Sequence, residues 1–193
     1  QFHRPIELGA PNPPSAQWPV TGAGAIVLTD SGEGPRITSA TIGRVVDGGR
    51  SDVNDLGSAV ASAAADTLAA HFREMKRNPD YYDLIVSGDL GKLGSALLEE
   101  MCMSSGFRLG VNYMDCGVVI YDQKQDVHAG GRGCGCSASM ICGPFLNRIG
   151  SHQIRRLLVV GTGAMMTHQS GDSIPGIAHA VAIEQVNGKG KKQ

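Results

Sequence analysis

The pattern of hydrophobic and polar positions predicts a chain in which strands alternate with helices. The longest helix is expected to begin at Asp52, capped by Ser51 or by Asp52 itself, and to end near Lys76, before Pro79. Its apolar positions recur at helical spacing: Val53, Leu56, Val60, Ala64, Leu68, Phe72 and Met75. The other face carries small residues: Gly57, Ala61 and Ala65. A helix with such a face is usually buried between two layers.

Two further helices are predicted downstream. The first covers about residues 92–105, where Gly106 is expected to end it in a left-handed conformation. The second follows a glycine-rich stretch and continues to about Ile149. Pro144 lies inside it and removes one backbone hydrogen bond, so we expect a kink or a break near residues 140–142.

Short apolar runs predict the strands. Residues 20–29 are rich in glycine and alanine, which indicates a backbone packed closely by another element. The β-branched alternation of residues 36–46 is expected to pair with that strand. The other strands are expected at residues 82–87, 116–121, 156–161 and 178–185, with a polar excursion at residues 162–175. Strands alternating with helices indicate an α/β layered fold.

Composition and charge narrow the class of protein. The 193 residues suffice for one domain or for a piece of a larger one, and an apolar fraction of 41% suffices for a core. A net charge of −1 calls for neither nucleic acid nor an anionic membrane surface. No apolar run reaches the roughly 18 residues that a membrane-spanning helix needs, and we expect no signal peptide at Gln1. The five cysteines are interpreted as reduced thiols in an intracellular compartment.

The two ends of the chain differ from its middle. Four of the nine prolines fall within the first 18 residues, which is typical of a segment that crosses between halves of a larger protein. We therefore expect residues 1–19 to connect to a preceding half and residues 20–186 to form the domain. Residues 187–193, which include the basic cluster of the chain, are expected to be a disordered tail.

The stretch with the most evident chemistry is residues 128–140, His-Ala-Gly-Gly-Arg-Gly-Cys-Gly-Cys-Ser-Ala-Ser-Met. Its glycine loop, residues 130–135, lets backbone N–H groups approach a ligand closely. Ser137 or a neighbour is expected to cap the next helix, whose positive end would suit an anion. Arg132 adds a fork of donors suited to a carboxylate. The spacing matches neither a Walker loop nor a dinucleotide fingerprint, so a tight packing turn is an equal alternative.

Metal binding and nucleophilic catalysis are not expected. Cys134 and Cys136 are too close in sequence for an easy disulfide, and no second cysteine pair stands at a finger-like spacing. Cys134, near a helix N-terminus, is a candidate nucleophile without a base that the sequence places beside it. His128 has no carboxylate partner fixed by sequence and is interpreted as a strand-end residue. His71 is expected only to favour the dipole near the end of the longest helix.

Six motifs distributed along the chain resemble those of a known family. They are Val20-Thr-Gly-Ala-Gly-Ala-Ile-Val-Leu28, Tyr82-Asp-Leu-Ile-Val-Ser-Gly-Asp-Leu90, Asp115-Cys-Gly117, Ala129-Gly-Gly-Arg-Gly-Cys-Gly-Cys-Ser-Ala138, Gly161-Thr-Gly-Ala164 and Ile174-Pro-Gly-Ile-Ala-His-Ala180. Together they resemble the second half of a thiolase-fold protein, and most closely the stage V sporulation protein AD family. The resemblance runs over essentially all 193 residues.

The resemblance implies an α/β fold of the thiolase type, of which this chain is the C-terminal half. That half would be a mixed β-sheet with a buried helix on one face and helices on the other. The whole protein would stack two such halves in five layers. The small face of the helix predicted at residues 52–76 would then lie against the missing N-terminal half, which carries the counterpart of the thiolase nucleophile.

One departure from the enzymes of this fold implies a protein that is not an enzyme. Condensing enzymes of the thiolase fold need a histidine, and often an asparagine, after the strand that matches residues 82–87. The matching residues here are Gly88-Asp89-Leu90-Gly91, and an ionised aspartate cannot donate to an oxyanion. His128 stands nearest to the position of the second thiolase cysteine. The resemblance therefore implies a cavity that persists without carbon–carbon bond chemistry.

The function implied by the resemblance is binding of dipicolinic acid (pyridine-2,6-dicarboxylate) for its uptake into the forming spore and its release at germination. This flat dianion needs donors for two carboxylates and an apolar slot for its ring. The expected ligand-binding residues are Asp89, Asp115, Cys116, His128, Gly130, Gly131, Arg132, Cys134, Ser137 and His179. Cys116 and His179 have packing roles as their alternatives. Asp89 and Asp115 would repel a dianion unless they are protonated, bridged by calcium or used to structure the loop.

Two other functions stay open: a thiolase-like acyltransferase that uses an acyl-cysteine, and a membrane-docked scaffold without a small ligand. No cofactor is expected, and calcium only as a chelate with the ligand. The expected partners are the other stage V sporulation A channel proteins, the N-terminal half and, as an alternative, a second copy in a homodimer. The expected location is intracellular, in the forespore and spore, peripheral at the spore inner membrane.

Overall fold

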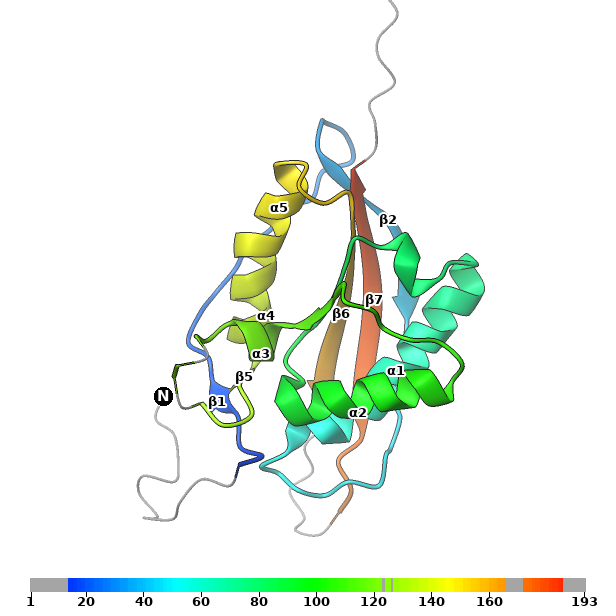
Figure 1. The fold of residues 1–193 in the computed structure, drawn as a ribbon. Helices are drawn as coiled ribbons and strands as arrows, with labels where there is room; N and C mark the ends of the chain where they lie inside the picture. Colours follow the sequence, from blue (N-terminus) through cyan, green and yellow to red (C-terminus); the bar gives the residue numbers. More distant parts are fainter. Residues whose placement is uncertain (1–13, 123, 126, 166–171, 186–193) are drawn as a thin grey trace, which may run out of the picture.

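Five strands form one mixed sheet in the order β2-β7-β6-β3-β4 (Figure 1). The computed structural model describes residues 14–122, 124–125, 127–165 and 172–185. The strands of the sheet are β2 (Pro35–Ile42), β3 (Leu84–Ser87), β4 (Tyr113–Asp115), β6 (Arg156–Ala164) and β7 (Gly176–Gln185). β3 is parallel to both β4 and β6, whereas β7 is antiparallel to β6 and to β2. β1 (Trp18–Pro19) and β5 (Gly131–Arg132) form a separate parallel pair.

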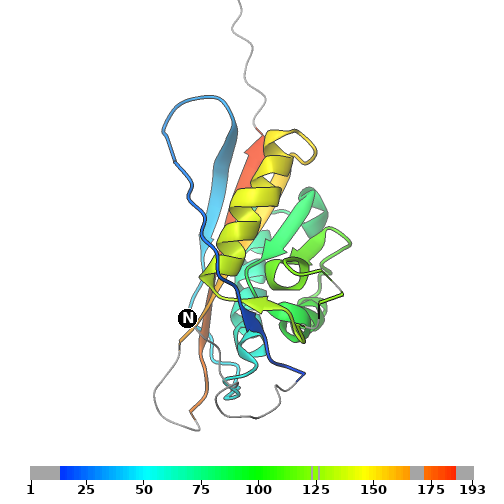
Figure 2. The same ribbon diagram turned by 90° about the vertical axis from the view of Figure 1, so that its left-hand side faces the viewer.

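Helices cover both faces of this sheet (Figures 1 and 2). One face carries α1 (Leu56–Met75) and α2 (Gly91–Ser104). The other carries α4 (Cys134–Met140), the π-helical turn η3 (Ile141–Phe145) and α5 (Leu146–Gly150). Two short elements, η2 (Pro79–Tyr81) and α3 (Cys116–Val119), connect the layers. The predicted fold class, α/β with a mixed sheet and helices on both faces, is confirmed.

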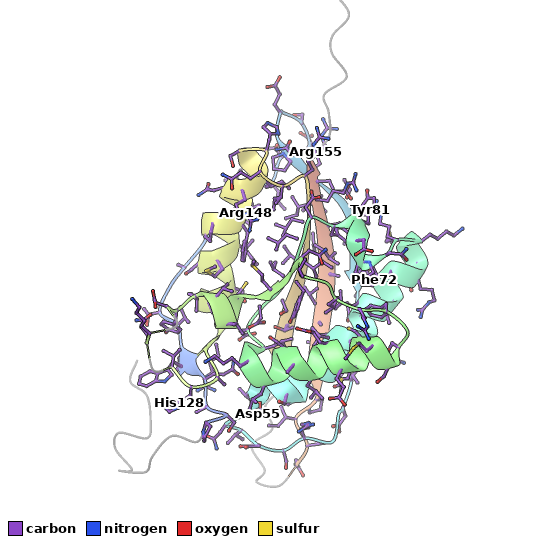
Figure 3. All side chains as sticks on the ribbon, viewed as in Figure 1. Asp55, Phe72, Tyr81, His128, Arg148 and Arg155 are labelled. Atoms are coloured by element: carbon purple, nitrogen blue, oxygen red, sulfur yellow. The ribbon has the colours of Figure 1, made fainter. Side chains whose placement is uncertain are left out.

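α1 is the longest helix that the sequence predicts, but it begins four residues later than expected (Figure 3). Its cap is Asp55, not Ser51 or Asp52, because the Asp55 carboxylate accepts a hydrogen bond from the N–H of Ser58 at 3.1 Å. Asp52 instead stabilises the preceding turn by accepting from the N–H of Asn54 at 2.8 Å. Among the other elements, β3, α2, β6 and β7 lie close to their predicted positions.

The small-residue face of α1 is covered by this chain itself, so the prediction that it faces a missing half is wrong. Five alanines of α1 are at most 7% exposed: Ala59, Ala61, Ala63, Ala64 and Ala65. α2 crosses α1 so closely that a Cβ on Gly57 would overlap the carbonyl of Leu90. A Cβ on Gly94 of α2 would lie 2.6 Å from the carbonyl carbon of Gly57. The small residues therefore seat α2 and the sheet on α1.

The strand predicted at residues 20–29 is wrong. These residues form an exposed segment that belongs to no strand, and β2 pairs with β7 instead (Figure 2). The expected close packing of this backbone is nevertheless present, because a Cβ on Gly24 would lie 2.6 Å from the carbonyl oxygen of Ala138 in α4. The glycines thus place the segment on a helix rather than beside a strand.

The strand predicted at residues 116–121 is also wrong, because the chain turns there into α3. The strand ends earlier, as β4, and Asp115 caps α3 by accepting from the N–H of Val118 at 3.2 Å. The β-branched Val118 and Val119 favour a strand only where a pleated neighbour packs against them. The cap outweighs that preference.

The break predicted at Pro144 is confirmed. α4 ends at Met140, and the π-helical turn that contains Pro144 leads into α5. Pro144 lacks the N–H that would donate to the carbonyl of Met140, so the α-helical bonding pattern cannot continue through it. Phe145, the last residue of the turn, and Ile149 of α5 pack into the core on this face of the sheet.

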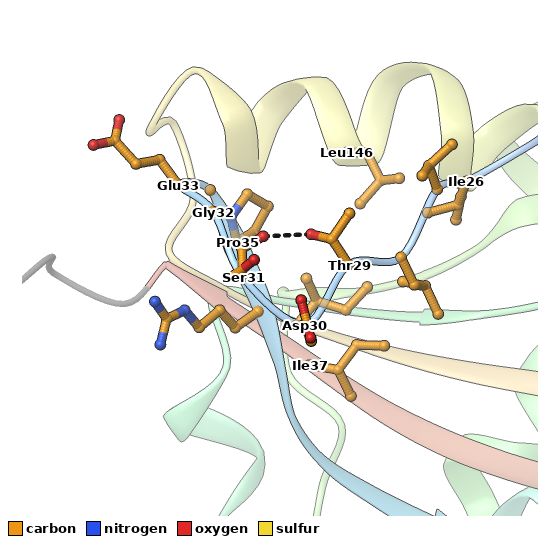
Figure 4. A pocket seen from close by; sticks show the side chains of 14 residues that line it. Ile26, Thr29, Asp30, Ser31, Gly32, Glu33, Pro35, Ile37 and Leu146 are labelled. Atoms are coloured by element: carbon orange, nitrogen blue, oxygen red, sulfur yellow. Dashed lines mark hydrogen bonds between the residues drawn. The ribbon is translucent and has the colours of Figure 1, made fainter.

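A cavity of about 650 Å³ lies between the exposed segment, β2, β7 and α5 (Figure 4). Its apolar lining comprises Ile26, Val27, Leu28, Pro35, Ile37, Leu146 and Ile183. At its rim the hydroxyl of Thr29 donates to the carbonyl of Ser31 at 2.6 Å. None of the residues that line this cavity belongs to the glycine loop.

Candidate functional site

The carboxyl ends of three parallel strands bring separate segments of the chain together. β3 ends in the turn at residues 88–91, β4 ends at Asp115, and β6 carries Thr162 near its end. The register places Ser87 of β3 beside Asp115 on one side and beside Val160 on the other. In open α/β sheets, ligands bind at this edge, outside the carboxyl ends of the strands.

Asp115 anchors the turn after β3 and the start of α3. Its carboxylate accepts from the hydroxyl of Ser87 at 2.6 Å, from the N–H groups of Leu90 and Gly91 at 2.9 Å each, and from that of Val118 at 3.2 Å. Burial, with 2% of the residue exposed, raises the pKa of Asp115 to about 6 against the opposing effect of these donors. The carboxylate faces inward, so its role in this structure is to hold the turn.

Asp89 bridges the glycine loop and β6. Its Oδ2 accepts from the N–H of Gly133 at 2.6 Å, and its Oδ1 accepts from the hydroxyl of Thr162 at 2.9 Å. Gly133 is also the N-cap of α4, so the prediction that Ser137 or a neighbouring side chain caps this helix is wrong. The anion that the sequence predicts at the start of α4 is supplied by the chain itself.

The glycine loop is packed tightly on both sides. The side-chain amide of Gln17 donates to the carbonyls of Asp89 at 2.8 Å and of Gly131 at 2.9 Å. The N–H of Trp18 donates to the carbonyl of Gly130 at 2.8 Å. Gly130 takes a φ of 111°, and a Cβ there would overlap the carbonyl of Gly117. Gly130 and Gly131, both predicted to bind a ligand, are therefore buried parts of the scaffold.

Two thiols lie buried in the core beside this edge of the sheet. Cys116 and Cys136 have no exposed surface, and burial raises both thiol pKa values, that of Cys136 to about 12. The charges of Asp89 and Asp115 raise both pKa values further, which disfavours the thiolate form at neutral pH. Cys134, the first residue of α4, is exposed instead.

Ser137 of α4 also lies at the carboxyl edge of the sheet. It is half-buried, and its hydroxyl oxygen would lie 3.1 Å from a Cβ on Gly88. The hydroxyl oxygen of Thr162 would lie 2.6 Å from the same Cβ. A side chain at position 88 would therefore crowd both hydroxyl groups, so Gly88 allows Ser137 and Thr162 to pack closely on the end of β3.

The other predicted site residues lie at the margin of this cluster or outside it. Arg132 belongs to β5, half-buried and in register with Pro19. His128 precedes the glycine loop with a φ of 51°, and it is half-buried (Figure 3). His179 lies on β7, where its Nδ1 accepts from the N–H of Gly43 at 3.1 Å, so its ring is engaged at the end of β2.

Two residues of the cluster, Thr162 and Gln17, are missing from the sequence-based prediction. Thr162 stands within the Gly161–Ala164 motif quoted above, so the motif located it, but only the fold shows that its hydroxyl meets Asp89. Gln17 lies in a proline-rich segment that gives no signal of its role. Within the described residues, no group of three or more metal-ligating side chains comes together, and no helix is long and apolar enough to cross a bilayer.

The mixed sheet, the helices on both its faces and the glycine loop at its carboxyl edge define an α/β domain with an aspartate after β3. The chain belongs to the stage V sporulation protein AD family, whose model matches residues 1–184. It is 41% identical over 191 residues to stage V sporulation protein AD of Bacillus subtilis (strain 168). That match covers 97% of this chain and 56% of the relative, so the chain spans little more than half of the relative's length. The family predicted from the motifs is confirmed.

Two solved structures are similar in fold. AbyA1, a tetronic acid condensing enzyme, matches with a TM-score of 0.42 and 17% identity over 78% of this chain and 47% of its own. MvaS, in complex with 3-hydroxy-3-methylglutaryl coenzyme A, matches with a TM-score of 0.44 and 15% identity over 80% of this chain and 41% of its own. Likeness at this level concerns the fold alone.

Proposed function

We propose that this sporulation protein binds dipicolinic acid without transforming it, for uptake into the spore and release at germination. The observation that carries the proposal is the cluster at the carboxyl edge of the sheet. The turn after β3 brings together the N–H of Gly133, which contacts Asp89, and the hydroxyl of Ser137, which packs on Gly88. Such donors suit the carboxylates of a flat diacid.

The residue after Gly88 supports binding without acyl chemistry. Stabilising an oxyanion or an enolate requires a hydrogen-bond donor, and the carboxylate of Asp89 only accepts. Both of its oxygens are already engaged, by Gly133 and by Thr162. The buried thiols of Cys116 and Cys136 have raised pKa values, which disfavours an acyl-cysteine.

We place the N-terminal half on the face of the sheet that carries α4 and α5. Large exposed apolar side chains gather on the segment and the strand beside these helices: Ile26 at 52%, Val27 at 88%, Leu28 at 72%, Ile37 at 50% and Ile42 at 87%. Large exposed apolar side chains of this kind are typical of a protein interface. The relative from Bacillus subtilis has the additional length that a second half requires.

The proposal includes a location and a set of partners. The protein acts in the forespore and spore, peripheral at the inner membrane, together with the other stage V sporulation A channel proteins. Calcium enters only as a chelate of the ligand. A chelate would also relieve the repulsion between the dianion and the carboxylate of Asp89.

Calorimetric titration of dipicolinate into protein with both halves present tests the proposal. We expect saturable binding of the 2,6-diacid, with and without equimolar calcium, and weaker binding of pyridine-3,5-dicarboxylate, in which the two carboxylates diverge. Incubation with acyl-coenzyme A should leave the intact mass unchanged. Absence of dipicolinate binding, or an acyl adduct on a cysteine, would overturn the proposal.

A further inference from the structure

We propose that Asp89 is an internal competitor of the ligand. Its carboxylate occupies the N–H of Gly133, which a ligand carboxylate would use, and it must leave that donor before the ligand binds. The inference rests on the proposed function, because it concerns the same site. It assigns Asp89 to the regulation of the site rather than to contact with the ligand.

The contact between Asp89 and Gly133 is close and accessible. At 2.6 Å the distance from Oδ2 to the amide nitrogen is shorter than the roughly 2.9 Å of an ordinary amide hydrogen bond, as expected for an ionised acceptor. Gly133 is exposed, and a Cβ there would meet no other atom within 4 Å. The loop is therefore open to solvent at Gly133, and a second carboxylate can reach its N–H once Asp89 has left.

The carboxylate of Asp89 can move without moving its backbone. The following residues of the turn are fixed by Asp115, which accepts from the N–H groups of Leu90 and Gly91. Gln17 holds the carbonyl of Asp89 itself at 2.8 Å. Among the described residues, the hydrogen bonds to the side chain of Asp89 come from Gly133 and Thr162, both at its carboxylate. Rotation of this one side chain therefore switches the donor between an occupied and a free state.

When a ligand carboxylate replaces the carboxylate of Asp89, the N–H of Gly133 keeps a hydrogen-bond acceptor, but the negative charge of the ligand is added to that of Asp89 nearby. An incoming carboxylate restores the bond that Asp89 gives up, so the loop neither gains nor loses a partner. While Asp89 stays in place, it also repels the dianion. The affinity for a dicarboxylate is therefore lowered by the free energy needed to release Asp89 from its two donors.

The test compares three variants in protein that contains both halves. Asp89→Asn keeps the shape and removes the charge, so we expect about tenfold tighter binding of dipicolinate, the effect of one charge-assisted hydrogen bond. Thr162→Val removes one of the two donors that hold Asp89, and a gain of about threefold is expected from the loss of one neutral donor.

Asp83→Asn is the matched control, because Asp83 precedes β3 as Asp89 follows it. Its carboxylate also accepts from backbone N–H groups, those of Arg155 at 2.7 Å and of Arg156 at 2.9 Å. Asp83→Asn removes one negative charge, as Asp89→Asn does, but at the other end of β3. The affinity for dipicolinate should therefore stay within about twofold of the wild type. A gain in both aspartate variants would identify a general charge effect and overturn the inference.

The amide proton of Gly133 gives a second readout that a purely structural role of Asp89 would not move. Its NMR resonance should lie far downfield in the ligand-free protein, shift upfield in Asp89→Asn, and return downfield when dipicolinate is added. If the wild type binds dipicolinate and Asp89→Asn binds it equally or more weakly, the competitor role is wrong and the proposed function stands. If neither binds, both fall. If Asp89→Asn does not fold, unchanged affinity in Thr162→Val overturns the inference.

Discussion

Nε2 of His71 lies 2.6 Å from the hydroxyl oxygen of Tyr82, and both side chains are buried. Arg77 donates to the same tyrosine oxygen at 3.1 Å, which directs the proton of Tyr82 toward His71. Nδ1 of His71 therefore carries the proton of the ring and donates to the hydroxyl of Thr41, 2.8 Å away. This chain of hydrogen bonds requires a neutral imidazole and joins α1 to β2 and to the segment that leads into β3.

Acid is expected to destabilise the protein through His71. Burial, and then the charge of Arg77, lower the pKa of His71 from its ordinary 6.5, against an opposing effect of Glu74. The unfolded chain therefore takes up a proton that the folded chain resists. This part of the stability is complete above about pH 6.5 and is lost as the pH falls toward the lowered value. Urea unfolding at a series of pH values from about 7.5 to about 5 measures the effect.

The matched variants for this prediction are His71→Gln and His152→Gln. Glutamine can both donate and accept at position 71 but does not titrate, so the decline in stability below pH 6.5 should become shallower. His152 is exposed after α5, and its replacement should leave the pH profile unchanged. Parallel profiles for the wild type and His71→Gln would contradict the assignment.

Replacing the buried carboxylate of Asp115 is expected to cost stability. In Asp115→Asn one oxygen becomes an NH₂ group that faces donors, among them the N–H groups of Leu90 and Gly91. We expect a loss of about 2–4 kcal/mol in the free energy of unfolding, because buried donors are left unpaired. The exposed Asp80 provides the control, since Asp80→Asn should change stability by less than about 0.5 kcal/mol.

The wild type and Asp115→Asn should also differ in how their stability depends on pH, and the sign of this dependence is opposite to that expected for His71. The pKa of Asp115 is raised from 3.8 to about 6, so the folded chain takes up its proton at a higher pH than the unfolded chain. The stability linked to this group is present at low pH and is lost as the pH rises through about 6. The wild type should therefore gain stability relative to Asp115→Asn as the pH is lowered from about 7 to about 5. A difference that does not change with pH would count against this environment for Asp115.

The crossing of α1 and α2 predicts an unequal response to alanine at two helical glycines. In Gly57→Ala the new Cβ would overlap the carbonyl of Leu90, so the helices must separate, and we expect a loss of about 1–3 kcal/mol. In Gly150→Ala, at the end of α5, the new Cβ meets no atom within 4 Å, and stability should rise by up to about 1 kcal/mol. Thermal unfolding of the two variants measures both effects. Equal responses would contradict the close crossing.

The exposed apolar face predicts where a second half docks. Val27→Thr together with Ile42→Thr should weaken association of the two halves, expressed as separate chains, by at least about tenfold, because apolar area is lost from the interface. Val111, which is 104% exposed, lies between α2 and β4 and provides the control as Val111→Thr. Calorimetry of the mixed halves measures the affinities. An effect of Val111→Thr as large as that of the double variant would remove the assignment of the face.

Elements decided by local pattern are predictable from this sequence, and those decided by distant partners are not. The stripe through Leu68 and Phe72 identifies α1 because its spacing repeats over five turns. The prediction that His71 only favours the helix dipole is wrong, because His71 is buried and hydrogen-bonded to Thr41 and Tyr82, which belong to other elements. Val118 and its neighbours have strand-like composition, and only the cap from Asp115 explains why they form α3.

The candidate site divides in the same way. The motifs place Asp89 and the glycine loop in one protein, but the hydrogen bond between Asp89 and Gly133 depends on the path of the chain after β3. The sequence predicts an anion at the start of α4 and cannot tell that a side chain of the same chain provides it. Thr162 becomes part of the site only through the pairing of β3 with β6, which brings it to the end of the turn.

The two hydrogen bonds donated by Gln17 matter for the choice of the first residue when this domain is produced in a shortened form. Composition suggests a boundary after Pro19, yet Gln17 is only 5% exposed and its amide joins the carbonyls of Asp89 and Gly131. A protein engineered to start at Val20 would lose both hydrogen bonds of Gln17 and the whole of β1. Its glycine loop would be free to shift, and a negative result with such a shortened protein would report the trimming rather than the native molecule.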